Sequence, residues 1–564
     1  MAEEQKKSGI SIGGDRKAIA VFFVILLLQI ALYMFLFIFA KTAHHEDEFF
    51  SYGMANSYDR PFLYGSGYSV YDNYNTWMKG ADFWDYITVQ KGQAFRYDTV
   101  WANQTVDTHP PLYYTLIHTI SSVFAGNFSW WWAFGINLSA FIVSQVFLYR
   151  LVKNIANREV PALLVCAFWG FSVAGQNTHL FLRMYALYTM FCILFVWFLQ
   201  KAREAEKTGT MRELVPLGFV VAGGALTQHL FLVFAFFLTL SVCICELWQK
   251  QWKRVLWIGG AVAAGVLLSI MIFPATLQHL FGGTGVVWHG ESGIYENLRF
   301  LLILALGELT GILLHMHAGQ NWWEILFVIM AFLLPAGLLF MGRSKITGAK
   351  RSRIIMPVSL YYTILCYLLL VSGQIYYGEF GMETDRYVFV LMPLMCVVAV
   401  PVLVSGAEKI SERLQKGKRP GAIGVVMVVI LLLVLQNNEP LFRNYIQEAD
   451  PSNGSVASYL SGQNCLFMCA PILQPCFCQM LAGAEDIYVV LPYDEGYRTD
   501  VKAEDLMRLN SNGRFYLLVD TEWKQGEELL SMLQYFADQT GTSVYYCTEE
   551  TTHGVRVGLY EFSR

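Results

Sequence analysis

Residues 17–48 read KAIAVFFVILLLQIALYMFLFIFAKTAHHEDE, and this stretch decides the class of the fold. Its first part, residues 18–40, holds 23 consecutive residues without a charged side chain. As a helix, this block would be longer than the roughly 30 Å needed to cross the hydrocarbon core of a membrane. It is also too long for the core of a signal peptide and lacks a small-residue cleavage site. We therefore predict a transmembrane helix here.

The remaining sequence repeats this pattern of apolar blocks. Of the 564 residues, 55% are hydrophobic and only 15% are charged, whereas a soluble domain carries about 25% charged residues. This composition excludes a soluble or a disordered protein, and a formal net charge of −4 argues against a nucleic-acid binder. The sequence predicts a mainly α-helical polytopic membrane protein.

The basic residues set the predicted topology. Six segments hold 24 of the 40 lysines and arginines, and the positive-inside rule places them in the cytoplasm. These segments are 1–17, 150–158, 201–212, 250–254, 343–353 and 409–419. The assignment requires that residues 109–125, predicted as a half-buried or interfacial helix, and residues 296–316 do not span. Eleven spans remain, so the tail lies outside: 18–40, 129–149, 160–177, 184–200, 213–230, 232–248, 255–275, 322–341, 354–373, 387–404 and 421–436.

The composition changes after the last predicted span. The tail carries 18 acidic and 8 basic residues and alternates strand-like runs with helical patterns, which predicts a small extracytoplasmic α/β domain. The strand-like runs are 487–491, 515–519 and 543–546, and one helical pattern covers 525–537. The predicted domains are a cytoplasmic N-terminus, a transmembrane domain and this tail: 1–17, 18–436 and 437–564.

Five of the eleven cysteines lie in the tail. Two of them are separated by a single residue, which is one short of the gap in a usual zinc knuckle. Disulfides outside the cell are therefore the favoured prediction, and a metal cluster is the alternative. The five are Cys465, Cys469, Cys476, Cys478 and Cys547.

The loop after the first span is long and aromatic. Residues 41–109 contain 16 aromatic, nine acidic and five basic side chains, which favours helices in the membrane interface over a solvated linker. Residues 41–127 are therefore predicted to form a first outside loop with interfacial helices. Near its end, Pro110 and Pro111 fix two backbone angles and predict that a helix begins just after His109.

Residues 44–48, HHEDE, put three consecutive carboxylates close to the membrane surface. A carboxylate there can act as a general base or as a metal ligand, and His44 and His45 could be metal ligands beside it. The alternative is a charged cap that keeps the first helix from sliding into the membrane.

Five short elements together resemble a known family. Asp47-Glu48 after the first span, and His109-Pro-Pro-Leu-Tyr-Tyr114 at the end of the loop, look like membrane glycosyltransferases of the GT-C fold. They are most similar to the group of dolichyl-phosphate-mannose protein mannosyltransferases and bacterial aminoarabinose transferases. All five elements fall on the outside of the topology predicted from charge. The other three are Arg183-Met-Tyr185, Thr227-Gln-His229, whose Gln departs from the family pattern, and Arg386-Tyr387 followed by Pro393.

The resemblance implies a transfer of a sugar from a polyprenyl-phosphate lipid to an extracytoplasmic glycan, lipid or protein acceptor. It implies Asp47 as the general base and Glu48 as the group that orients Asp47 or the acceptor. An arginine at a membrane boundary can also simply snorkel, which stays the alternative for the two arginines below. The implied donor phosphate-binding residues are Arg183, Tyr185, Arg386 and Tyr387, and the site-shaping residues are His109, Pro110, Pro111 and His229.

The resemblance leaves a divalent metal ion open, because some members of the family use one and others need none. Ligands for it could come from Asp47, Glu48, His109 and the segment His289-Gly-Glu291. No spacing in the sequence selects among them.

Two other classes of function compete with this one. A polytopic transporter or lipid flippase would place ionisable residues at mid-membrane depth, and the predicted spans hold almost none. A cell-surface receptor would leave the aromatic, acidic loop unexplained. The sequence names neither the sugar nor the acceptor, and it favours a multi-pass protein of a bacterial plasma membrane.

Overall fold

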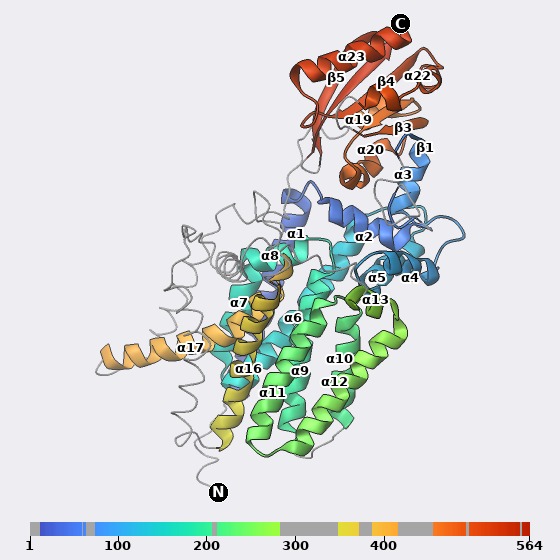
Figure 1. Ribbon diagram of the computed structural model, residues 1–564. Helices are drawn as coiled ribbons and strands as arrows, with labels where there is room; N and C mark the ends of the chain where they lie inside the picture. Colours follow the sequence, from blue (N-terminus) through green and yellow to red (C-terminus); the bar gives the residue numbers. More distant parts are fainter. Residues whose placement is uncertain are drawn as a thin grey trace, which may run out of the picture. The chain divides into compact units, whose positions relative to one another are not determined.

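The chain forms two compact units in the computed structural model (Figure 1). We call them the helical unit (Met1–Met34, Asn137–Leu180 and Met184–Asn444) and the sheet unit (Phe35–Ile136, Phe181–Arg183 and Tyr445–Arg564). The structure describes residues 12–58, 60–63, 74–205, 211–281, 348–371, 386–414, 455–491, 496–552 and 555–564.

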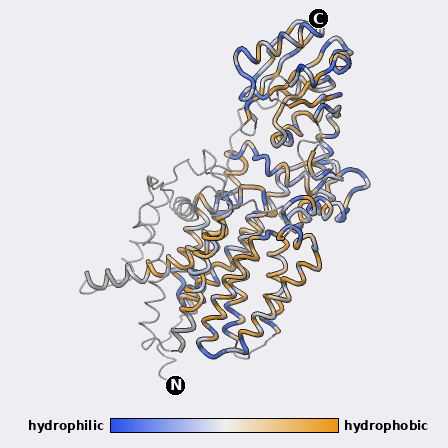
Figure 2. Tube along the Cα trace, viewed as in Figure 1, coloured by the Kyte–Doolittle hydropathy of each residue, from blue (hydrophilic) through white to orange (hydrophobic). Residues whose placement is uncertain are grey.

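Apolar helices build the helical unit. Helices α9, α10, α11 and α12 run side by side and are hydrophobic over most of their length (Figures 1 and 2). In addition, α11 packs against α16, and α7 packs against α17. The helix bounds are α1 (Ile12–Phe35), continued by the π-helix η1 (Leu36–Ala40), α6 (Trp130–Ala156), α7 (Glu159–Phe171), α8 (Val173–Leu180), α9 (Tyr185–Glu204), α10 (Met211–Ala225), α11 (Leu230–Trp248), α12 (Trp252–Ile272), α13 (Ala275–Phe281), α16 (Gly348–Val371) and α17 (Leu391–Leu414).

Within the described residues, five helices are long and apolar enough to cross a membrane, or six if α7 and α8 form one bent span. The five cover Arg16–Ala40, Trp130–Ala156, Tyr185–Glu204, Leu230–Trp248 and Trp252–Ile272. The prediction of a mainly α-helical polytopic membrane protein is thereby confirmed. The predicted spans 322–341 and 421–436, and the segment 296–316, lie outside the described residues.

The predicted span 160–177 is not one straight helix. It breaks at Ser172 into α7 and α8, which are bent by 60°. The Ser172 hydroxyl donates to the carbonyl of Trp169 at 2.6 Å and accepts from the backbone N–H of Gly175 at 3.1 Å. This side chain satisfies backbone groups on both sides of the break, as serine does at helix ends. The residues next to the break are apolar, but α8 also carries the polar run 176–179 (QNTH).

A six-stranded mixed sheet forms the other unit, in the order β1-β3-β2-β4-β6-β5. Strand β2 is parallel to β3 and β4, and the remaining pairs are antiparallel. The predicted strands and the predicted helix α23 (Gly526–Thr540) are confirmed, and with them the small C-terminal α/β domain. The strands are β1 (Thr76–Lys79), β2 (Cys465–Met468), β3 (Asp486–Val490), β4 (Arg514–Asp520), β5 (Ser543–Thr552) and β6 (Val555–Ser563).

One strand of this sheet comes from the first loop and not from the tail. Trp77 in β1 stands opposite Tyr488 in β3. Its indole donates to Oδ1 of Asp505, 428 positions away, at 2.9 Å. The guanidinium of Arg508 lies 3.9 Å from the centre of the Trp77 ring, a cation–π contact. The loop and the tail therefore fold together, and the sheet extends beyond the predicted tail domain.

Short helices fill the rest of the first loop. Helix α5 begins directly after Pro110 and Pro111, as predicted, and its 12 residues are too few to span a membrane. The loop is therefore a folded layer and not a linker. Its helices are α2 (Glu46–Asn56), α3 (Gly80–Ile87), α4 (Tyr97–Val106) and α5 (Leu112–Val123).

The prediction of disulfides in the tail is wrong for this structure. All eleven cysteines lie in its described part, and all are free thiols. Cys465, Cys469, Cys476 and Cys478 are buried, where a thiol packs as a small hydrophobic group. Burial raises the pKa of each of these four thiols above the ordinary value, so they stay protonated.

Candidate active site

The start of α2 places the three acidic residues of the HHEDE stretch. His45 caps the helix, because its Nδ1 accepts from the backbone N–H of Asp47 at 3.2 Å. The Glu48 carboxylate accepts from the backbone N–H of His45 at 3.1 Å, which closes a reciprocal capping box. Glu46, Asp47 and Glu48 all lie in the first turn, where the helix dipole favours negative charge.

Glu48 is fully buried and held by four donors. Its Oε1 accepts from Nζ of Lys41 at 3.0 Å and from the backbone N–H of Leu182 at 2.6 Å. Its Oε2 lies 2.9 Å from Nδ1 of His44 and also accepts from His45. The side chains of Lys41 and Glu48 are both completely inaccessible to solvent. Glu48 therefore anchors the start of α2 to the end of the first membrane helix and to the segment before Arg183.

The charges in this cluster follow from burial and pairing. Burial by itself would raise the pKa of Glu48. The attraction of Lys41 and His44 outweighs this effect and lowers the pKa to about 2. Burial lowers the pKa of His44 to about 4, against the attraction of Glu48. Burial also lowers the pKa of Lys41, which Glu48 raises in part. Near neutral pH, the cluster is an ion pair between Lys41 and Glu48 with a neutral His44 beside it.

Asp47 is the more accessible member of the Asp47-Glu48 pair, and 21% of its side chain is exposed. Its Oδ1 lies 3.9 Å from Nη2 of Arg183. Nη1 of Arg183 donates to the backbone carbonyl of Asp47 at 3.1 Å and to Oγ of Ser51 at 3.3 Å. Arg183 is itself nearly buried. The guanidinium therefore holds the first turn of α2 and stands beside the Asp47 carboxylate.

A second acid and a buried phenol complete this region. Oδ2 of Asp107 lies 2.9 Å from Nδ1 of His109. Although burial raises the pKa of Asp107, His109 and Arg183 lower it below its ordinary value. Tyr113 is buried, and its hydroxyl meets no hydrogen-bond partner in the described part of the chain. Burial, with Tyr52 and Glu48 close by, raises the pKa of Tyr113, so this phenol keeps its proton.

The same cluster borders a cavity of about 630 Å³ in the sheet unit. Lys41 and His44 line it together with Trp130, whose ring stacks on His44 at 3.7 Å between centres. Its other walls combine apolar groups such as Phe37 with polar ones such as Gln479. Polar and apolar groups share these walls about equally, so the cavity is more polar than a typical small-molecule site, which is lined mainly by hydrophobic and aromatic side chains.

The sheet unit brings together Asp47, Glu48, Arg183 and His109, four of the residues singled out in the sequence. Pro110 and Pro111, which are buried in this unit, set the start of α5. The other four belong to the helical unit. There Tyr185 is buried, Arg386 lies over the ring of Tyr387 at 5.5 Å, and Nε2 of His229 is 3.2 Å from Nδ1 of His279.

Sequence reasoning missed Lys41 and Ser51. Lys41 is a lone cation at the end of 23 uncharged residues and seven positions before Glu48, a placement that could have indicated a partner for the carboxylates. Nothing in the sequence pointed to Ser51, because a serine inside an aromatic helix carries no signal.

Within the described residues, the candidate ligands do not form a site for a divalent metal ion. In the described residues, no three His, Cys, Asp or Glu side chains gather into a group that could hold one. Glu48, which would be the buried ligand, already receives four donors. His289 and Glu291 lie outside the described residues.

The pKa of His44 predicts how stability depends on pH. The folded protein keeps His44 neutral down to about pH 4, whereas the unfolded chain takes up a proton near the ordinary value of 6.5. Stability present above pH 6.5 is therefore lost as the pH falls toward 4. We expect the Tm to fall between about pH 7 and pH 5, and to fall less steeply in His44→Gln, because Gln does not titrate. Equal slopes in thermal unfolding of the two proteins would contradict this.

Comparison with known proteins gives structural neighbours only. No family model and no curated protein matches the chain. Two similar solved structures are crystal structures of ArnT from Cupriavidus metallidurans, one in the apo state and one bound to undecaprenyl phosphate. Each is 11% identical to this chain, with TM-scores of 0.43 and 0.42. The alignments cover 95% of this chain and 97% of the apo structure, and 98% of both chains for the complex. A likeness at this level carries no argument about substrates or catalytic residues.

Proposed function

We propose that the chain is a membrane glycosyltransferase that moves a sugar from a polyprenyl-phosphate donor to an acceptor on the outer face of the membrane, with Asp47 as the general base. The motifs that resemble the GT-C family suggest this reaction. The observation that carries the proposal is the pairing of the partly exposed Asp47 carboxylate with the Arg183 guanidinium. The neighbouring Glu48 carboxylate is buried and already accepts four hydrogen bonds from the protein.

The reaction needs a base, a stabilised leaving group and a fixed geometry. The acceptor hydroxyl or amine gives its proton to Asp47 as its oxygen or nitrogen bonds to the anomeric carbon of the sugar. The bond from that carbon to the phosphate oxygen breaks, and the phosphate leaves with the electron pair. Arg183 is suited to stabilise this developing negative charge, because a guanidinium matches phosphate geometry. The Tyr113 phenol is a further donor that could serve the same oxygen.

Glu48 is unsuited to the role of base. A general base must reach the proton it takes, and both oxygens of Glu48 are buried and already accept hydrogen bonds. We assign Glu48 a positioning role, in which it holds the turn that presents Asp47.

The test of the proposal is a transfer assay in membranes with a radiolabelled polyprenyl-phosphate sugar, run beside a substrate-uptake assay. Transfer of label from the donor lipid to an acceptor that can be separated from it would support a transferase. Uptake without transfer would support the transporter alternative. In the described helices, the buried ion pairs of Glu246 with Arg203 and Arg254 lie at helix ends, which favours the transferase.

We propose that Arg183 and Arg386, together with Tyr185 and Tyr387, bind the donor phosphate. Lysine keeps the positive charge but loses the planar fork. Arg386→Lys should therefore raise the donor concentration needed for half-maximal transfer several-fold, and Arg386→Ala should raise it further. If Arg386 only anchors the chain at the membrane boundary, Lys should substitute freely. Identical donor curves for wild type, Lys and Ala at both arginines would exclude their proposed role in binding the donor phosphate.

The outward-facing site rests on the topology predicted from charge. Lys91 and Ser531 are exposed in the sheet unit, and Arg150 is exposed in the last two turns of α6. In a background without reactive cysteines, Lys91→Cys and Ser531→Cys should react with an impermeant maleimide in intact cells, whereas Arg150→Cys should react only after lysis. The opposite labelling pattern would place the site in the cytoplasm.

A further inference from the structure

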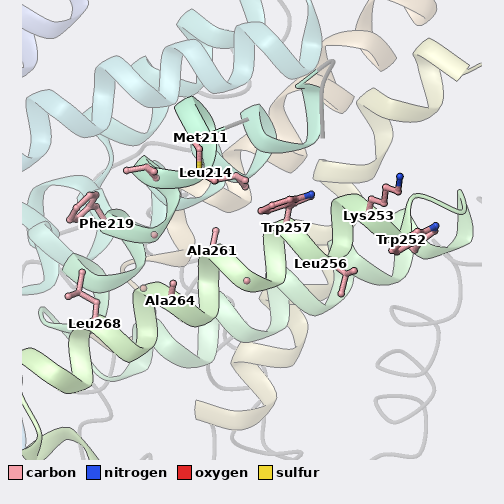
Figure 3. A pocket seen from close by; sticks show the side chains of 14 residues that line it. Met211, Leu214, Phe219, Trp252, Lys253, Leu256, Trp257, Ala261, Ala264 and Leu268 are labelled. Carbon is pink, nitrogen blue, oxygen red and sulfur yellow. The ribbon is translucent and has the colours of Figure 1, made fainter. Parts of the chain in front are cut away.

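A groove runs along the helical unit between α10 and α12, and none of the residues assigned to the proposed reaction lines it (Figure 3). Its volume is about 1000 Å³. Most of the fourteen residues that line it are apolar, and none is acidic. The groove is open to the surroundings of the helices, and exposed side chains such as Phe219 and Leu256 form its rims.

Small residues create this groove. A Cβ added to Gly265 would lie 2.4 Å from the carbonyl oxygen of Gly218, so the two helices touch through their backbones there. A Cβ added to Gly260, which also lines the groove, would meet nothing within 4 Å. Ala261 and Ala264 continue this line along α12 (Figure 3). The groove is therefore deep because glycine and alanine, which have little or no side chain, line it where α10 and α12 are in close contact.

One end of the groove is polar and positively charged. Lys253 lies there, with Trp252 and Trp257 close by (Figure 3). Helix α12 begins at this end with Trp252, and Lys253 is the one charged residue among the described residues that line the groove. In the described part of the chain, Lys253 forms no ion pair, whereas the neighbouring Arg254 is paired with Glu246. The ammonium of Lys253 lies 5.6 Å from the centre of the Trp252 ring. Lys253 therefore brings a positive charge without an acidic partner to the mouth of an apolar trough.

The length of the trough fits a lipid chain. From Lys253 to Leu268, α12 rises about 23 Å at 1.5 Å per residue, which is more than half of the roughly 30 Å hydrocarbon core. An apolar chain can follow the trough with its head group at the Lys253 end. Tryptophan indoles prefer the head-group level, and basic pockets between membrane helices bind anionic head groups.

We infer that this groove binds an anionic glycerophospholipid, with acyl chains along α10 and α12 and its phosphate beside Lys253. The bound lipid belongs to the leaflet in which the two helices begin, which the charges place on the cytoplasmic side. The proposed donor lipid reacts on the other side, so the groove is a second lipid site that stabilises the pair of helices.

The chain offers a matched pair of variants for a test. Gly260→Leu places a side chain in the groove, at a position where an added Cβ meets nothing within 4 Å. Gly259→Leu adds the same side chain one residue away, at a position that does not line the groove and where an added Cβ also meets nothing within 4 Å. Both replace a helix glycine by a good helix former, so neither should fail to fold. Lys253→Gln removes the charge at the mouth, and Arg150→Gln removes an exposed charge elsewhere.

The experiment measures phospholipid bound to the purified full chain by native mass spectrometry, and the Tm during titration with phosphatidylglycerol or with phosphatidylcholine of the same acyl chains. Phosphatidylglycerol should raise the Tm of the wild type more than phosphatidylcholine does. Gly260→Leu should lose the bound lipid. Lys253→Gln should lower the affinity for phosphatidylglycerol about fivefold, as expected for the loss of one cationic contact. The two control variants should behave as the wild type.

Three outcomes would overturn the inference. The first is an equal rise in Tm with the two lipids, because the groove would then bind acyl chains without recognising the head group. The second is a Gly260→Leu protein that retains as much anionic phospholipid as Gly259→Leu. The third is a polyprenyl phosphate, rather than a phospholipid, that disappears in Gly260→Leu. None of these outcomes depends on sugar transfer, so they are distinct from a failure of the proposed function.

Discussion

Asp47→Asn is expected to abolish sugar transfer and to leave the fold intact. Removing a general base typically lowers a rate by about 100-fold to 10,000-fold, and asparagine cannot accept the proton. The fold should tolerate the change because Asp47 supports α2 through its backbone carbonyl, which receives Arg183 and Ser51. The measurement is turnover of purified protein in lipid vesicles with saturating donor and acceptor, together with the Tm.

A neighbouring acid provides the matched control. Glu46 lies in the same turn and is 20% exposed at the side chain, almost the same as Asp47. Glu46→Gln should retain most of the activity, since it removes an equal charge from the surface without removing the base. If Asp47→Asn keeps more than about a tenth of wild-type turnover, a loss smaller than a base produces, Asp47 is not the base.

Glu48→Gln is expected to destabilise the protein strongly. Breaking a buried ion pair by removing one partner costs about 3–5 kcal/mol, because the remaining charge is left in an apolar environment. Here the charge left behind is that of Lys41, whose side chain is completely buried. We expect the effect in the free energy of unfolding or the Tm, with activity lost in proportion to the unfolded fraction. A milder change, as would suit a residue that only orients a substrate, would show that the anchor is dispensable.

A double-mutant cycle separates pairing from other effects. Lys41→Met should destabilise about as much as Glu48→Gln, because it isolates the opposite charge. The double variant should cost clearly less than the sum of the two single changes, since it leaves no buried charge. Asp98→Asn is a suitable control, because its ion pair with Arg96 is exposed and such pairs contribute little. Strict additivity of the two single changes would show that Lys41 and Glu48 do not act as a pair.

Part of the candidate site could be predicted from the sequence. The HHEDE stretch directly follows a membrane span, so its position at a boundary follows from chain order alone. The start of α5 after Pro110 and Pro111 could also be predicted, because proline restricts the backbone locally. The different roles of Asp47 and Glu48 could not be predicted from the sequence. The two residues are adjacent and have the same chemistry, and they differ only in which of them faces Lys41 and the backbone of Leu182.

The sequence by itself determined the class of this protein: a run of apolar residues long enough to cross a membrane needs no tertiary partner to be recognised. The same holds for the strands β3, β4 and β5 and for α23, whose patterns are local. Only the tertiary structure decided that β1 joins a sheet more than 400 residues later, that Lys41 neutralises Glu48, and that α7 and α8 are bent at Ser172. It also decided that glycines on two helices open a groove beside Lys253. The physical reason is that burial and pairing depend on which distant surfaces meet, and a hydropathy or charge pattern describes each segment alone.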